Sequence, residues 1–291
     1  MIAFCSALLV AVAGASGGAA QCDPVYRSSA RAQVDSTCAA FLRLVRSVQE
    51  ADYLGDLDRL QTLHVAMAPF VHEPALAKHA RYWRGFALWR RAFNALGQGG
   101  SPDSTDADFK RANEEFRHAL RLDSTYAEAR IGLVAGLSNR VFFNRDAALR
   151  TAFIREYRPL LDELARSDAD NPRFVFVAAP QLFHAPVAVG GSRSDAIAMV
   201  EAAIARLAPD RTDTLEATLE PTWGGPELHM LLATLLLRSR RQLDEAQRHA
   251  ERALTQRPTW RAVRDNLIPS IAAMRSTPPR HFPTPTDRSG P

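Results

Sequence analysis

The stretch Ala112–Ser124 constrains the fold of this 291-residue chain more than any other segment. An alanine is followed four positions later by an aromatic residue, then after three by a second alanine, and after five more by a turn residue; these are Ala112, Phe116, Ala119 and Ser124. Because an α-helix turns once every 3.6 residues, the first three share one face. The small alanines allow a neighbouring helix to lie close, and Phe116 can fill the gap between adjacent helix pairs. The spacing therefore predicts a helix stacked among others.

The same spacing recurs twice toward the C-terminus. The second copy is Ala196, Val200, Ala203 and Ala208, and the third is Ala246, Ala250, Ala253 and Pro258. The intervals between the copies are unequal, so the sequence predicts an irregular array of helix pairs with insertions. Residues smaller than Phe stand at the aromatic position of both later copies, which indicates thinner packing toward the C-terminus.

Apolar residues at helical spacing predict further helices around these copies. Helices are expected over 28–49, 56–71, 74–96, 107–122, 145–168, 228–237 and 261–274, with a further pair beginning at 124 and a short helix at 173–183 bent at Pro180. Asp103, Asp106 and Asp108 are expected to cap the helix that starts at 107 and to favour its dipole. No strand is predicted, so the chain belongs to the all-α class.

The expected helix 74–96 carries an aromatic stripe formed by Tyr82, Phe86, Trp89 and Phe93. Gly85 lies beside the stripe, at a point where a partner helix can approach closely. Such a stripe is more often core than ligand site. Trp83 and Arg90 lie off the stripe and are expected to be freer for other roles.

With these residues, the chain resembles the tetratricopeptide-repeat superfamily over most of 74–275. It departs from the family pattern at Arg84, where leucine is usual, and at Thr234, where glycine is usual. It looks like exported bacterial repeat proteins of unassigned role and, more distantly, like helical periplasmic proteins that accompany substrate-capture transporters. The resemblance implies an α-α superhelix, a solenoid of antiparallel helix pairs. Its first helices would line a concave surface that holds a peptide, a partner protein or a small ligand.

The N-terminus predicts export. Residues 1–15 are uncharged and apolar, and the small residues that follow predict a signal peptide over 1–20, cleaved after Ala20. A lipoprotein anchored at Cys22 is the alternative, and contact with a membrane is expected only if the N-terminus is retained or lipidated. The mature chain is then one helical-repeat domain over 21–275, followed by a proline-rich disordered tail at 276–291. A periplasmic or secreted location follows.

Removal of the signal peptide leaves two cysteines, Cys22 and Cys38. An even cysteine count in an oxidising compartment predicts a disulfide. It would tie the N-terminal segment to the first long helix. Two free thiols are the less expected alternative outside the cytosol.

The sequence contains none of the usual catalytic signatures. We find no metalloprotease helix motif, nucleophile elbow or phosphate-binding loop, and no two histidines spaced to clamp a metal on one helix face. The net charge is +4, but basic and acidic residues alternate along the helices, which predicts a solvated surface rather than a nucleic-acid interface. These patterns predict a protein that is not an enzyme and binds no cofactor, metal ion or nucleic acid.

Six residues are candidates for ligand contacts in the concave surface: Trp83, Arg90, Asn94, Asn139, Arg173 and Trp223. Trp and Arg are enriched at binding hot spots, although each of these residues is individually more often structural. The first hypothesis is an exported scaffold that binds a protein or peptide partner. The second is a small-molecule-binding accessory protein of a transport system.

Overall fold

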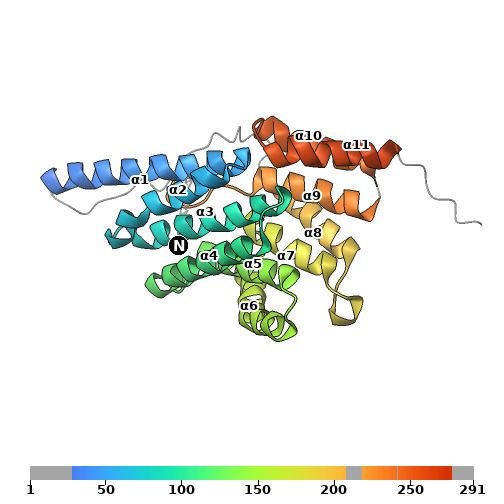
Figure 1. Ribbon diagram of the computed structural model, residues 1–291, viewed down its shortest axis with the longest axis horizontal. Helices are drawn as coiled ribbons and strands as arrows, with labels where there is room; N and C mark the ends of the chain where they lie inside the picture. The colour runs from blue at the N-terminus through green and yellow to red at the C-terminus, as the bar shows by residue number, and fades with distance from the viewer. Residues whose placement is uncertain (1–27, 208–217, 241, 277–291) are drawn as a thin grey trace, which may run out of the picture.

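The computed structural model describes residues 28–207, 218–240 and 242–276, with side chains from Ser36 onward. Within these ranges the chain is helical and contains no strand (Figure 1). The helices are α1 (Ser28–Leu54), α2 (Leu57–Ala66), α3 (Ala77–Gly97), α4 (Pro102–Leu122), α5 (Ala127–Phe143), α6 (Ala147–Ser167), α7 (Pro172–His184), α8 (Arg193–Arg206), α9 (Gly225–Ser239), α10 (Leu243–Gln256) and α11 (Ile268–Ser276). Shorter helical turns are η1 (Ala68–His72), η2 (Val187–Val189) and η3 (Ala262–Leu267).

Consecutive helices pack as antiparallel pairs: α1 with α2, α3 with α4, α5 with α6, α7 with α8, and α9 with α10. The first helices of successive pairs, α3, α5, α7 and α9, also contact one another in that order. We call the surface that these four helices form the inner face. This arrangement is the predicted α-α superhelix.

The stretch Ala112–Ser124 packs as its spacing predicts. Ala112, Phe116 and Ala119 of α4 are fully buried. A Cβ added at Gly85 of α3 would lie 2.8 Å from the Phe116 ring, and one added at Gly132 of α5 would lie 2.5 Å from it. Real Cβ atoms do not come so close, so both neighbouring helices approach Phe116 only because they carry glycine there.

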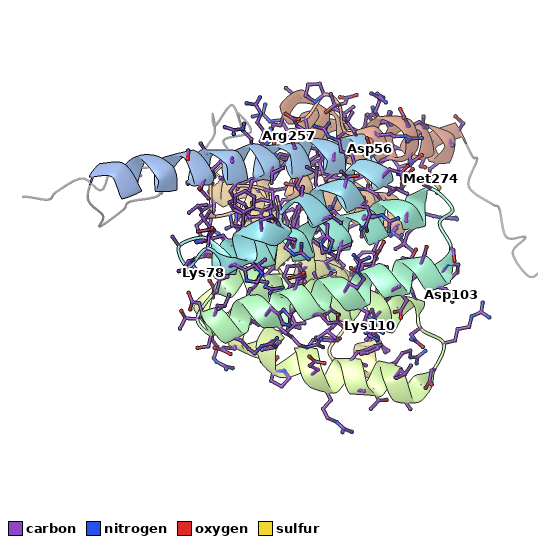
Figure 2. All side chains as sticks on the ribbon, turned by 60° about the vertical axis from the view of Figure 1, so that its left-hand side comes forward. Asp56, Lys78, Asp103, Lys110, Arg257 and Met274 are labelled. Atoms are coloured by element: carbon purple, nitrogen blue, oxygen red, sulfur yellow. The ribbon has the colours of Figure 1, made fainter. Side chains whose placement is uncertain are left out.

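The superhelix curls until its first and last pairs meet, so that α1 and α10–α11 lie along the same edge (Figure 1). The Tyr53 hydroxyl of α1 donates a 2.6 Å hydrogen bond to Glu227 of α9, and the Tyr53 ring packs edge-on against Trp260. Arg257 lies beside α1 (Figure 2), 5.2 Å from the Tyr53 ring. Burial raises the pKa of Glu227, and Gly224 N–H also donates to its carboxyl. This buried junction joins the two ends of the repeat array.

Several predicted boundaries are wrong: α1 ends at Leu54 rather than at 49, for example, and α9 begins at Gly225 rather than at 228. The expected helix 56–71 is divided after α2, because Pro69 cannot donate a helical hydrogen bond, and η1 follows. Helix α4 begins at Pro102 rather than at 107, since proline suits the first turn of a helix. The expected closing helix begins as the π-helical turn η3 and continues as α11 to Ser276, which was assigned to the tail.

The earlier start of α4 corrects the expected roles of its aspartates. Asp103 lies in the first turn of α4, as a dipole partner should. Asp106 instead pairs with Arg140 of α5 at 2.7 Å, and Asp108 pairs with Arg91 of α3. Two of the three expected caps therefore join neighbouring helices.

The signal peptide, Cys22 and the tail beyond Ser276 lie outside the described residues. Cys38 is buried on α1. None of the described helices is long and apolar enough to cross a membrane.

Candidate functional site

Half of the inner face is covered by the chain itself. The segment 218–224, which precedes α9, packs against α3 and α7. The Trp83 indole N–H donates to the Leu219 carbonyl at 2.9 Å, and the Arg173 guanidinium donates to the Trp223 carbonyl at 2.9 Å. We call this region, with the segment 218–224 at its centre, the filled half.

Trp223 is the central side chain of the filled half and is only 5% exposed. Its ring lies 5.6–5.8 Å from Phe86, Trp89 and Phe176, as ring centroids. Its indole N–H donates to the Tyr82 hydroxyl at 3.0 Å. Burial raises the pKa of Tyr82 well above its usual value, so this hydroxyl stays neutral. Aromatic contact area and a satisfied N–H together fix Trp223 in place.

An ion pair between α5 and α7 stabilises the filled half. Arg173 donates to both carboxylate oxygens of Glu128, each at 2.7 Å, and Asn171 donates to Glu128 at 2.9 Å. The two charged side chains are 17% and 9% exposed. Arg173 is therefore committed to holding the segment 218–224 and the α7 N-terminus.

The expectation that Trp83 and Arg90 are free for a ligand is wrong. Trp83 is fully buried and Arg90 is 2% exposed. Arg90 donates to the Asp52 carboxylate of α1 at 2.8 Å, and Asn94 donates to the same carboxylate at 2.9 Å. The helical pattern identified the face on which these residues lie. It could not identify that α1 and the segment 218–224 cover that face.

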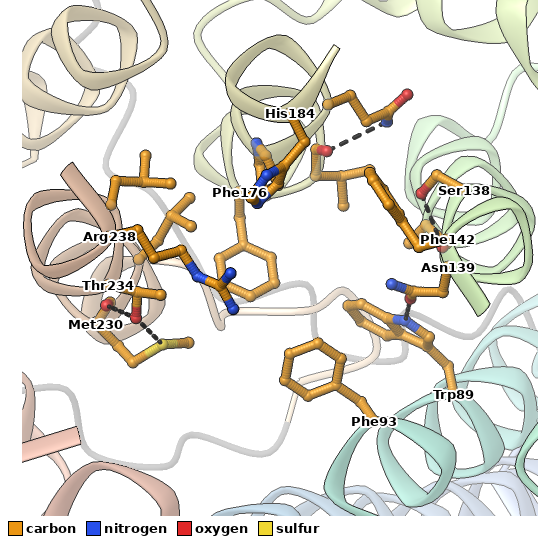
Figure 3. A pocket seen from close by; sticks show the side chains of 16 residues that line it. Trp89, Phe93, Ser138, Asn139, Phe142, Phe176, His184, Met230, Thr234 and Arg238 are labelled. Carbon is orange, nitrogen blue, oxygen red and sulfur yellow. Dashed lines mark hydrogen bonds between the residues drawn. The ribbon is translucent and has the colours of Figure 1, made fainter. Parts of the chain in front are cut away.

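The remaining part of the inner face holds a pocket of about 240 Å³, to which α3, α5, α7 and α9 all contribute (Figure 3). We call it the open half. Its walls are mostly apolar, and the rings of Phe93 and Phe142 are 36% and 50% exposed. Its lining includes Trp89, Phe93, Asn139, Phe142, Thr234 and Arg238.

Of the six predicted contact residues, Asn139 alone lines this pocket. Asn94 reaches an adjoining hollow, which also borders Phe93 and Arg238. Trp83, Arg173 and Trp223 belong to the filled half, and Arg90 belongs to the contact with α1. The structure thus brings only Asn139 to the pocket and distributes the other five over the adjoining hollow, the filled half and the contact with α1.

Sequence reasoning missed Arg238 and Phe142. A signal was present for both. Arg238 ends the apolar run of the α9 helix one turn after Thr234, the position noted for lacking the usual glycine, and Phe142 is one of two adjacent aromatic residues at the end of α5. A charged or aromatic side chain at the exposed end of an apolar helix can indicate a ligand-binding or interaction surface.

Two histidines that looked isolated in the sequence meet in the structure. His229 of α9 and His249 of α10 stack, with 2.8 Å between their Nδ1 atoms. Burial, followed by the charge of the other imidazole, lowers the pKa of His229 to about 4. One neutral ring therefore donates to the other. No group of three or more metal-binding side chains occurs among the described residues.

Comparison with solved structures finds similar folds. The model is similar to the crystal structure of a thermophilic TPR protein from Thermus thermophilus, with a TM-score of 0.49 and 20% sequence identity, covering 80% of this chain and 97% of that chain. No family model and no curated protein matches. The helix pairing described above is itself what makes the chain an α-α superhelix.

Proposed function

We propose that this chain is a non-catalytic binding protein whose open half holds one small, mostly apolar ligand. The observation that carries the proposal is the pocket of about 240 Å³ on the inner face, lined by side chains from four successive first helices. Ligand pockets of proteins are typically concave and apolar with few polar groups. A pocket that depends on four repeats is a property of the whole array rather than of one unit.

The division of the inner face supports a small ligand over an extended peptide. An extended peptide needs a continuous surface along the repeats. Here the segment 218–224 occupies the part in front of Trp83 and Arg173, and the hydrogen-bonding groups there are already used. What remains accommodates a compact ligand. A protein or peptide partner remains the second candidate, and the exposed rings of Phe142 and Phe143, 50% and 54% exposed, are the observation that favours it.

The test uses N-phenyl-1-naphthylamine, an uncharged apolar probe whose fluorescence rises in apolar sites. We expect saturable binding with one site per chain. The variant Thr234→Phe should abolish it, because the added ring occupies the pocket. The matched control is Thr151→Phe on α6, since both threonine hydroxyls donate at 2.9 Å to a carbonyl one turn earlier and Thr151 faces solvent. Equal binding by both variants would contradict the proposal, provided that circular dichroism shows both folded.

The proposal also places the protein outside the cytosol, with residues 1–20 removed and Cys22 joined to Cys38. The uncharged apolar N-terminus and the two remaining cysteines support this. Expression in a Gram-negative host followed by intact-mass measurement of the periplasmic fraction tests it. We expect the mass of a chain that begins at Gln21, and we expect reduction of the Cys22–Cys38 disulfide to add the mass of two hydrogen atoms. A lipidated N-terminus would contradict it in favour of an anchored protein.

A further inference from the structure

The open half contains a cation without a counter-ion. Arg238 lies in the last turn of α9, and its guanidinium extends toward the middle of the pocket, between Phe176 and Phe93 (Figure 3). It makes no ion pair or hydrogen bond with any described residue, and no Asp or Glu lines the pocket. The acid of the adjoining hollow, Asp265, is engaged by Arg264 at 2.7 Å. The position of Arg238 thus leaves its charge available to a ligand.

A second donor faces the same space. Trp89 Nε1 donates to the side chain of Asn139 at 3.0 Å. An indole N–H can only donate, so it must contact the Asn139 oxygen, Oδ1. The amide nitrogen Nδ2 takes no part in this hydrogen bond. That nitrogen is turned toward the pocket (Figure 3). The orientation of Asn139 is therefore fixed by Trp89, and it presents N–H groups to a ligand.

The other polar side chains of the pocket add neither a second positive charge nor a free hydroxyl donor. Ser138 donates to the Ala135 carbonyl at 3.0 Å, and Thr234 donates to the Met230 carbonyl at 2.9 Å. His184 at the rim is held toward its neutral form, because burial, and then the charges of Arg238 and Arg193, lower its pKa. Gln181 also lines the pocket, but its amide N–H donates to the Val177 carbonyl at 3.2 Å and its Oε1 is buried. Apart from the neutral His184 ring at the rim, the pocket therefore offers one positive charge and the Asn139 amide N–H on a mostly apolar wall.

This pattern decides between classes of anion. A phosphate group carries up to two charges and needs several donors, whereas the pocket offers one guanidinium and one amide. A carboxylate matches that number, since its two oxygens can accept from a guanidinium fork and from the amide. The apolar wall suits a hydrocarbon body. The volume lies below the roughly 300 Å³ at which pockets for drug-sized ligands begin, which limits that body to a small one.

We infer that the ligand of the open half is a small apolar monocarboxylate, whose carboxylate pairs with Arg238 and Asn139 while its hydrocarbon part contacts Trp89, Phe93 and Phe142. The inference rests on the proposed function and adds the charge and class of the ligand. Arg238 is then the residue that selects a carboxylate over neutral molecules of the same shape.

The test compares three ligands of equal chain length by titration calorimetry on the full chain: octanoate, octan-1-ol and octylammonium. We expect octanoate to bind most tightly. Arg238→Gln should weaken octanoate about 10- to 100-fold, as expected for loss of a charged hydrogen-bond partner, and leave octan-1-ol unchanged. Arg238→Glu should reverse the preference toward octylammonium. The matched control is Arg248→Gln on α10, an exposed arginine outside the pocket.

The outcomes separate the two proposals. If octanoate and octan-1-ol bind equally and Arg238→Gln changes neither, the charge inference fails while the apolar pocket stands. If none of the three ligands binds and the naphthylamine probe also fails, the proposed function fails with it. An apolar tripeptide with a free C-terminus that binds more tightly than octanoate would overturn the small-molecule form and identify a protein C-terminus as the source of the carboxylate.

Discussion

The filled half and the open half of the inner face are built from the same helices and have opposite properties. In the filled half, Trp223 is 5% exposed, and its ring contacts the rings of Phe86, Trp89 and Phe176. In the open half, Phe93 and Phe142 are partly exposed and Arg238 has no partner among the described residues. Trp89 lies at the boundary, since it contacts Trp223 and also lines the pocket. One surface therefore combines a core-like region with a partly exposed one.

The difference teaches that repeat architecture alone does not assign a binding surface. Candidates such as Trp83 and Arg173 have the residue types of binding hot spots, yet they hold a segment of their own chain. The residues of the open half were less conspicuous in the sequence. We expect changes in the filled half to affect stability and changes in the open half to affect binding.

The largest effect is expected from Trp223→Ala. Removing a buried tryptophan leaves a cavity among Phe86, Trp89 and Phe176 and removes the hydrogen bond to Tyr82, which should lower the free energy of unfolding by about 3–5 kcal/mol. Urea denaturation measures it. Phe143→Ala, at a 54% exposed ring, is the control and should cost roughly 0.5 kcal/mol or less. Similar losses for the two variants would remove the distinction between the halves.

The next effect is expected from Glu128→Gln, beneath the filled half. The substitution leaves the Arg173 guanidinium nearly buried without its carboxylate, and we expect a loss of about 2–3 kcal/mol. The control is Asp162→Asn, which breaks the exposed pair with Arg158 and should change stability by less than about 0.5 kcal/mol. Chemical denaturation of both variants provides the comparison. An equally small loss at Glu128 would show that the segment 218–224 needs no ionic support.

Acidification should act in part at His64, which lies outside both halves, and in part at His79, whose pKa burial lowers to about 4 beside Glu220 of the segment 218–224. The His64 Nδ1–H donates to the Arg84 carbonyl, and its Nε2 accepts from the Arg84 guanidinium, both at 3.2 Å, so only the neutral ring fits. Burial first, and then the Arg84 charge, lowers the pKa of His64 to about 4. The folded state thus binds the proton less readily than the unfolded chain, whose histidine pKa is about 6.5.

Because the pKa of His64 is lower in the folded state than in the unfolded chain, the free energy of unfolding falls as the pH falls. The contribution of His64 is complete above the unfolded pKa and is lost as the pH falls toward 4, amounting to about 1–2 kcal/mol at about pH 5. Denaturation curves at neutral pH and at about pH 5 measure the loss, and His64→Gln should reduce their difference by that amount. An unchanged difference in His64→Gln would assign the acid sensitivity to other groups. Because His64 lies away from the pocket, the uncharged probe should still bind the folded protein at the lower pH.

The smallest change in stability is expected from Arg238→Gln. An exposed arginine whose side chain makes no hydrogen bond or ion pair with the described residues can be replaced within about 0.5 kcal/mol. Thermal and urea unfolding should therefore coincide with the unchanged protein, although binding of octanoate falls. A destabilisation above about 1.5 kcal/mol would instead make Arg238 part of the folded framework.

Much of the fold could be predicted from local patterns. The spacing of Ala112, Phe116 and Ala119 predicted both a helix and its close neighbours, and Gly85 was recognised as a point of close approach. These two predictions are confirmed because helical periodicity and side-chain size act within one or two turns of a helix. Helix ends were predicted less well: Pro69 and Pro102 moved boundaries by local backbone chemistry.

The candidate site could be predicted only in part. Asn139 was identified as a candidate and lines the pocket, whereas Arg90 was placed on an accessible surface and is buried against Asp52. Periodicity assigns a residue to a helix face but contains no information on which distant segment covers that face. The contacts that decided it, such as Trp83 with Leu219, join residues 136 positions apart.

The sequence by itself determined the helices, their pairing and the tight packing around Phe116, because these depend on residue size and spacing within a repeat. The tertiary structure alone decided that the array closes through Tyr53 and Glu227, and that the segment 218–224 fills half of the inner face. It also decided that Arg238 faces the remaining pocket. Small rotations between successive helix pairs add up along an array, so the curvature that brings its ends together belongs to the whole molecule and not to any one repeat.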